Sequence, residues 1–172
     1  MSAQIPYIHR VVDALNIPSV RQAGYEADDL IGSLAHQAEL AGFDVIIVTG
    51  DKDFFQLVGG AIRVYNPKDD GAWFDADGVK EKFGVLPSQV VDVLALMGDT
   101  SDNVKGVPGI GEKGARDLIV TFGSLDALLE RASEVKAKKQ REALVTYADD
   151  ARLSRRLVTI DTDVPVAFDP EA

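Results

Sequence analysis

Residues 24–53 read GYEADDLIGSLAHQAELAGFDVIIVTGDKD, and this stretch decides the fold. Its first half places apolar residues three and four positions apart, which predicts an amphipathic helix over residues 25–41 that Gly42 ends. The run from Phe43 to Val48 is short, apolar and β-branched, so we expect a strand buried on both faces of a parallel sheet. A helix followed by such a strand predicts an α/β fold.

The flanking segments extend this pattern and then change it. We expect a helix over residues 5–15, an extended link or short strand over 17–20, a short helix over 54–58 and a strand over 61–65. We expect Tyr65 and Trp73 to pack against the sheet rather than stack on bases. From residue 79 onward the pattern is helical, and we expect helices over residues 79–83, 87–97, 111–122, 125–131 and 136–147. One extended segment is expected near the end, over residues 164–168. We therefore expect an α/β core over residues 1–85 and an α-helical module over residues 86–172.

Composition excludes several classes of protein. The chain has 172 residues, of which 46% are apolar and 27% charged, and this is typical of a globular protein. Because it contains no cysteine, disulfide scaffolds, thiolate zinc sites and cysteine nucleophiles are excluded. No apolar run is long enough to span a membrane, and the start lacks the pattern of a signal peptide. We expect a cytoplasmic protein with no membrane partner.

The net charge of −10 is unevenly distributed. Residues 1–103 hold 16 acids and 7 bases, whereas residues 104–156 hold 8 acids and 11 bases. The acidic excess of the first part is typical of a carboxylate site, and the basic excess of the second part favours an anionic partner.

The acidic residues form three clusters, which are Glu26, Asp28 and Asp29, then Asp51 and Asp53, then Asp99 and Asp102. Asp51 and Asp53 follow the predicted strand directly, where α/β sheets bind ligands. If the clusters converge, their charges repel unless cations lie among them, and Mg²⁺ or Mn²⁺ suits oxygen ligands. Two such ions can hold the attacking and leaving oxygens of a phosphodiester. A single cluster is more often a helix cap or a solvated loop; three together favour the metal site.

The glycine-rich segment from Gly106 to Gly114 predicts a phosphate contact. Gly109, Gly111 and Gly114 formally satisfy G-x-G-x-x-G, but no buried strand precedes them, which argues against a dinucleotide site. A tight turn between two helices remains, with Lys113 and Arg116 beside free amides. We expect this hairpin to hold a DNA backbone without reading bases.

Four motifs in order resemble those of the 5′-nuclease family, which comprises the 5′ to 3′ exonuclease domain of bacterial DNA polymerase I and the flap endonucleases. The motifs are GYEADDL at 24–30, TGDKD at 49–53, LMGDTSDN at 96–103 and GVPGIGEK at 106–113. The resemblance implies a partial PIN-like (Rossmann-like) parallel-sheet core and a SAM-like helix-three-turn-helix module. It also implies two-metal hydrolysis of DNA with a 5′ end or flap, in replication and repair.

The resemblance also implies residue roles. Glu26, Asp28 and Asp29 would help bind one metal ion, and Asp51, Asp53, Asp99 and Asp102 the other, with Asp28, Asp51 and Asp53 as the catalytic carboxylates. Lys105, Gly109, Ile110, Gly111, Lys113 and Arg116 would contact DNA, and a K⁺ ion can bind at the same turn. Lys105 stands where the family commonly has Pro, and Gly114 where Thr is common.

The family pattern begins with a strand carrying an Asp ligand, then a further Asp and a basic arch, and these parts have no counterpart here. We therefore expect the chain to lack the N-terminal third of such a domain and to need an upstream segment or partner chain to complete the site. Alone it would cleave weakly, and the strand over residues 45–48 would have an unpaired apolar edge. One alternative function is the binding of DNA structures without catalysis. A further hypothesis, a nucleotide-dependent oxidoreductase, rests only on the glycine pattern.

Overall fold

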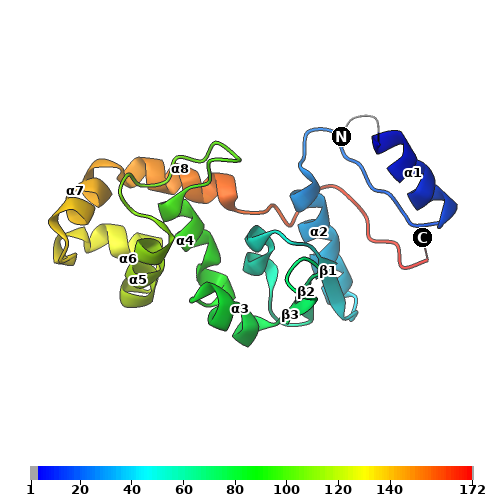
Figure 1. Ribbon diagram of the computed structural model, residues 1–172, viewed down its shortest axis with the longest axis horizontal. Helices are drawn as coiled ribbons and strands as arrows, with labels where there is room; N and C mark the ends of the chain where they lie inside the picture. The colour runs from blue at the N-terminus through cyan, green and yellow to red at the C-terminus, as the bar shows by residue number, and fades with distance from the viewer. Residues whose placement is uncertain (1–3, 172) are drawn as a thin grey trace.

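The computed structural model describes residues 4–171. The α-helices are α1 (Ile5–Ala14), α2 (Ala27–Leu40), α3 (Ala76–Phe83), α4 (Val90–Met97), α5 (Glu112–Phe122), α6 (Leu125–Glu130), α7 (Lys138–Thr146) and α8 (Ala148–Val158). The strands are β1 (Val45–Val48), β2 (Ile62–Asn66) and β3 (Ala72–Phe74), and the short 3-10 helices are η1 (Lys52–Leu57), η2 (Pro87–Gln89) and η3 (Ala132–Glu134). In Figure 1 the helices α4 to α8 form one end of the elongated molecule, and the sheet with α2 lies beside them. The expected α/β core followed by a helical module is confirmed.

The sheet has the order β1-β2-β3 within the described residues. β1 and β2 are parallel, with Val45 opposite Ile62, and β2 and β3 are antiparallel. The sequence analysis missed β3, a strand of three residues directly after a turn. The prediction that β1 is buried on both faces is wrong, because Ile47 is buried whereas Ile46 and Val48 are 51% and 65% exposed. The described helices leave one face of this edge strand open.

Of the two aromatic side chains at this end of the sheet, Trp73 differs from expectation, whereas Tyr65 is half-buried. Trp73 is 56% exposed, so the prediction that it packs into the sheet is wrong. Its ring lies 4.9 Å from that of Tyr65 on the paired strand, which is a cross-strand contact on the outer surface of the sheet.

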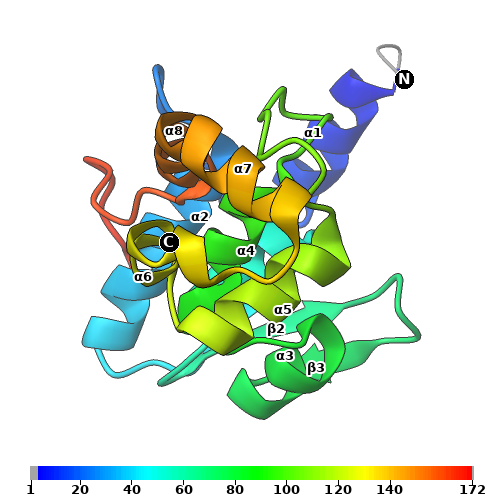
Figure 2. The same ribbon diagram turned by 90° about the vertical axis from the view of Figure 1, so that its left-hand side faces the viewer.

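Helix α4 forms the centre of the helical module. Its sequence is almost entirely apolar, and Val93, Leu94 and Leu96 are fully buried. Helix α4 packs against α5, α6 and α8, and Figure 2 shows α3 and the sheet on the opposite side of it from α8. A continuous apolar core extends from α4 to the sheet, where the rings of Phe55 and Phe74 lie 4.9 Å apart.

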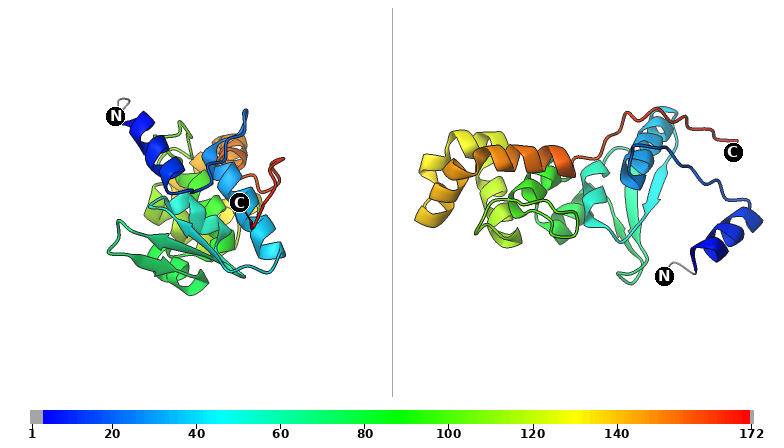
Figure 3. Two further views of the ribbon diagram at one scale, coloured as in Figure 1. Left: turned by 90° about the vertical axis from the view of Figure 1, so that its right-hand side faces the viewer. Right: turned by 90° about the horizontal axis from the view of Figure 1, so that it is seen from above.

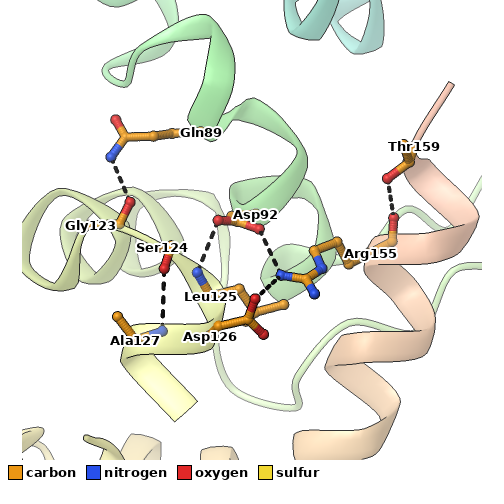
Figure 4. Close-up of polar contacts among 9 residues, drawn as sticks. All are labelled: Gln89, Asp92, Gly123, Ser124, Leu125, Asp126, Ala127, Arg155 and Thr159. Atoms are coloured by element: carbon orange, nitrogen blue, oxygen red, sulfur yellow. Dashed lines mark hydrogen bonds and ion pairs between the residues drawn. The ribbon is translucent and has the colours of Figure 1, made fainter. Parts of the chain in front are cut away.

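The one buried acid of this core, among the described residues, is Asp92 on α4. Its Oδ2 accepts a hydrogen bond of 2.9 Å from the amide of Leu125 at the start of α6, and its Oδ1 lies 3.8 Å from Nη1 of Arg155 on α8. Arg155 also donates to Asp126 at 2.8 Å (Figure 4). Asp92 thereby ties α4 to both α6 and α8. The sequence analysis had not separated α8, because two of its three buried residues, Ala151 and Ser154, are small.

After α8 the chain returns along α2 to the far end of the molecule (Figures 1 and 3). Residues 164–168, expected to be extended, form no strand in the described structure; side chains of α2 bind their backbone instead. The amide of Val164 donates to Oγ of Ser33 at 3.0 Å, and the amide of Phe168 donates to Oε1 of Gln37 at 2.9 Å. These contacts join the C-terminal segment to the α/β core.

The helix expected over residues 5–15 is confirmed as α1. It stands apart from the sheet in the described structure (Figures 1 and 3). Its apolar side chains remain exposed; Ile8 and Val11, for example, are each 57% exposed. Residues 17–20 form a link without a strand. Of the helices within residues 4–171, none is long and apolar enough to cross a membrane.

Candidate active site

The first acidic cluster begins α2. Glu26 is the residue before the helix, and its amide donates a hydrogen bond of 3.2 Å to Oδ2 of Asp29 in the first turn. The other carboxylate oxygen of Asp29 accepts a hydrogen bond of 2.9 Å from the amide of Asp161. Because two backbone amides already bind Asp29, its carboxylate is oriented by the protein.

The second cluster follows β1, as expected for a parallel strand. Oδ1 of Asp51 accepts a hydrogen bond of 3.0 Å from the amide of Asp53 and so caps η1. The amide of Asp51 donates to Oγ1 of Thr49 at 3.0 Å. This tight turn lets both aspartates stand at the carboxyl end of β1, where ligands of open α/β sheets bind.

The third cluster lies in a loop that two glycines close. Gly98 follows α4 with φ of +71°, and a Cβ there would lie 2.6 Å from the carbonyl oxygen of Val104. The backbones of Asp99 and Val104 exchange hydrogen bonds of 2.9 and 2.7 Å. Hydrogen bonds from Ser101 hold the pKa of Asp99 below its ordinary value. The loop therefore fixes Asp99 as an ionised carboxylate.

The structure brings the three clusters together. Two adjoining cavities, of about 160 and about 500 Å³, are lined by all seven candidate carboxylates and share Asp53 and Asp102. Glu26, Asp28 and Asp29 line the first cavity, and Asp51 and Asp99 line the second. The expected convergence of the acidic clusters is therefore present in the fold.

Electrostatic repulsion within the site is strong. Burial, followed by the charge of Asp51, raises the pKa of Asp53 to about 6. Burial also raises the pKa of Asp28, with contributions from Asp51, Glu26 and other neighbouring acids. Oδ1 of Asp53 is buried and has no hydrogen-bond partner among the described residues. A buried acceptor without a donor, surrounded by like charges, is the environment that a bound cation would stabilise.

The donor set fits a hard divalent cation, but not one held by three or more of the side chains as they stand. Within residues 4–171, no three His, Cys, Asp or Glu side chains are placed to hold one ion together. Repulsion between carboxylates acts over longer distances than a metal–oxygen bond, so the two observations are compatible. Mg²⁺ keeps several of its waters and binds through one or two carboxylates, which suits this open arrangement.

The sequence analysis did not identify the residues that line the smaller cavity beside its carboxylates. The end of α8 lines the smaller cavity through Leu157, Val158 and the residues that follow. Gln56 of η1 connects this wall to the acidic turn, since its Nε2 donates to the carbonyl of Val158 and its Oε1 accepts from the amide of Ile160, both at 3.0 Å. Periodicity could not reveal contacts between residues about a hundred positions apart.

The glycine-rich turn lies beyond the acidic site, before α5. Gly109 has φ of +82°, and both Gly109 and Gly111 are open to solvent on the side where a Cβ would stand. Ile110 is buried and anchors the turn, so it presents no side chain to a ligand. Lys105 is exposed. The turn therefore offers backbone groups and the exposed Lys105 to an anion.

The two basic residues of α5 differ from each other. Lys113 is exposed and pairs with Asp117 at 2.8 Å. Arg116 pairs with Glu112 and donates a hydrogen bond of 3.1 Å to the carbonyl of Phe83, so it also ties α5 to the end of α3. Of the two, Lys113 is the more accessible to a phosphate.

Comparison with known proteins gives consistent matches along the chain. A family described as "5′-3′ exonuclease, N-terminal resolvase-like domain" matches residues 1–84, and "5′-3′ exonuclease, C-terminal SAM fold" matches residues 85–172. DNA polymerase I of Rhizobium leguminosarum is 46% identical over 169 residues, and that of Chloroflexus aurantiacus is 48% identical over 175 residues. Each match covers 98% of this chain but only 16% and 18% of the relatives, so the chain spans less than a fifth of their length.

Solved structures share the fold. T5 5′-exonuclease with bound zinc aligns with a TM-score of 0.78 and 22% identity, over 88% of this chain and 56% of that chain. The catalytic core of Rad2 in complex with a DNA substrate aligns with a TM-score of 0.59 and 17% identity, over 98% of this chain and 60% of that chain.

Proposed function

The chain belongs to the 5′-3′ exonuclease family, and we propose that its acidic site hydrolyses phosphodiester bonds of DNA near 5′ ends or flaps. The observation that carries the proposal is the convergence of seven carboxylates, from three distant segments, on two cavities that share Asp53 and Asp102. A site that concentrates negative charge in this way suits a metal-assisted reaction on a phosphodiester.

We assign Glu26, Asp28 and Asp29 to one divalent ion, and Asp51, Asp53, Asp99 and Asp102 to the other. When bound, two Mg²⁺ or Mn²⁺ ions would activate the attacking water and stabilise the leaving 3′ oxygen. Asp28, Asp51 and Asp53 lie among the most mutually repelling charges, and we assign them the catalytic role. Asp29 keeps the start of α2 in place through its two amide contacts. The apolar side chains of Val104 and Leu157 line the smaller cavity beside these carboxylates.

We assign duplex binding to the turn before α5. The backbone amides at Gly109 and Gly111, with Lys105 and Lys113, would contact phosphate oxygens independently of sequence. Ile110 and Arg116 would hold the turn and the helix in position rather than bind as free groups. A K⁺ ion at this turn belongs to the same proposal. We place the activity in the cytoplasm, in DNA replication and repair, with an upstream segment or partner chain completing the site.

A second candidate is a DNA-structure binder without catalysis. It is favoured by the separation of the carboxylates, no three of which can hold one ion directly in the described part of the chain. The two candidates agree on DNA binding and differ on hydrolysis.

The test is cleavage of a 5′-flap DNA labelled at its 5′ end, in Mn²⁺ and in EDTA. We expect slow cleavage in Mn²⁺ that EDTA and Asp53→Asn abolish. In a binding assay, Lys113→Ala should reduce the dependence of log K on log salt by about one unit, whereas Lys82→Ala on α3 should not. Salt-dependent DNA binding without metal-dependent cleavage would establish the second candidate instead.

A further inference from the structure

Lys52 lies inside the acidic site, in the chain between Asp51 and Asp53. Its Nζ is 3.6 Å from Oδ2 of Asp99, and the two side chains are 38% and 17% exposed. Within the described residues it is the one base that forms an ion pair with any of the seven carboxylates. A single ammonium group therefore offsets part of the charge of the whole cluster.

The contact is loose. At 3.6 Å it is an ion pair without a hydrogen bond, so the flexible four-carbon chain of Lys52 is not locked in place. Asp99, in contrast, is held by its loop through the amide of Ser101 at 2.8 Å. The lysine can leave this pair while the carboxylate stays. The larger cavity, of about 500 Å³, gives the lysine room to turn.

We propose that Lys52 is an internal counter-cation of the metal-free site, which a divalent ion displaces from Asp99 and which then binds a phosphate oxygen of the DNA. The proposal rests on the proposed function of the site. A divalent ion at Asp99 would repel the ammonium group. It would also neutralise the negative charge of the carboxylates, which Lys52 offsets only in part. The displaced Nζ remains in the cavity that also holds Asp51 and Asp53, where an incoming phosphate would lie.

The first test is Mn²⁺ binding, measured by titration calorimetry at low salt without DNA. Lys52→Met removes the competing charge and should bind Mn²⁺ three- to tenfold more tightly than the wild type. Lys52→Arg keeps the charge and should bind within twofold of the wild type. The control is Lys82→Met, which makes the same change of charge and breaks an exposed pair with Asp69 outside the site; it should leave the affinity unchanged.

The second test follows the released lysine. Inorganic phosphate binding in Mg²⁺, measured by ³¹P NMR, should weaken at least threefold in Lys52→Met and remain unchanged in Lys82→Met. Equal Mn²⁺ affinities of Lys52→Met and wild type would overturn the counter-cation role, and unchanged phosphate binding would overturn the transfer to phosphate. Proteins that show both effects but never cleave DNA would refute the proposed nuclease function and leave this inference standing.

Discussion

The amide of Asp161 donates a hydrogen bond of 2.9 Å to Oδ1 of Asp29, although 132 residues separate them in the chain. Oδ2 of the same carboxylate accepts from the amide of Glu26 at 3.2 Å. A carboxylate that the family resemblance places at a metal ion therefore also joins the C-terminal segment to the start of α2. The acidic site and the return of the chain from the helical module are structurally coupled at this residue.

Replacing Asp29 should accordingly reduce stability as well as alter the site. Asp29→Ala removes both acceptors, and we expect a loss of about 1–2 kcal/mol in the free energy of unfolding, because a helix cap and a second hydrogen bond are lost. Asp29→Asn keeps one amide oxygen as an acceptor and should lose less than Asp29→Ala. Urea denaturation in EDTA measures both, and equal stability of Asp29→Ala and wild type would show that these contacts contribute nothing.

The raised pKa of Asp53 predicts an unusual pH dependence of stability. Its pKa rises from 3.8 to about 6 on folding, because of burial and Asp51. Between these values the folded state binds more protons than the unfolded state, so this group lowers the stability of the metal-free protein as the pH rises through this range. Asp53→Asn removes the effect.

We expect Asp53→Asn to be more stable than wild type by about 1 kcal/mol at about pH 7.5, and equally stable at about pH 4. The full shift corresponds to about 3 kcal/mol, but partial exposure to solvent weakens it. Urea denaturation in EDTA at both pH values gives the comparison, with Asp44→Asn at an exposed position as the control. A variant less stable than wild type at the higher pH would contradict the account.

The buried Asp92 and the exposed Asp126 make a matched pair, since both contact Arg155 (Figure 4). Asp92→Ala leaves the buried amide of Leu125 without its acceptor, and we expect a loss of about 2–3 kcal/mol in unfolding free energy. Asp126→Ala removes a solvent-exposed ion pair and should cost under about 1 kcal/mol. Thermal and urea unfolding of the two variants test this order. Similar losses would mean that the burial of Asp92 does not determine its contribution to the free energy of unfolding.

The open edge of the sheet predicts self-association. β1 pairs on one side only within the described structure, and the apolar side chains of Ile46 and Val48 are more than half exposed. An unpaired edge with apolar side chains is a template for strand pairing. Sedimentation velocity should show concentration-dependent association that Val48→Lys reduces. Val120→Lys, at an exposed position on α5, should leave it unchanged, and a monomer at all concentrations would refute the prediction.

The sequence predicted the elements whose patterns are local. The apolar spacing of α2 and the β-branched run of β1 determined their type, and Gly42 adopts the positive φ expected after a helix. The burial of β1 could not be predicted, because it depends on which helices cover the sheet. Helix α8 was missed because two of its three buried residues, Ala151 and Ser154, are small and give only a weak apolar periodicity.

The candidate site was predictable to a similar extent. The convergence of the acids followed from where the second cluster stands after β1, together with the family motifs. The roles of Gln56, Lys52 and Asp161 were not foreseen, because each depends on a contact made only in the folded chain. Lys52 stood within a quoted motif, but its pairing with Asp99 joins positions 47 residues apart.

The most direct test of the account is Mn²⁺ binding to the wild type, Asp51→Ala and Asp53→Ala, measured by titration calorimetry. The wild type should bind Mn²⁺. If the carboxylates form a divalent-metal site, each variant should bind at least about tenfold more weakly, which corresponds to about 1.4 kcal/mol or more for the loss of a ligating group. Affinities equal to that of the wild type in both variants would contradict the central claim that these carboxylates hold the ions.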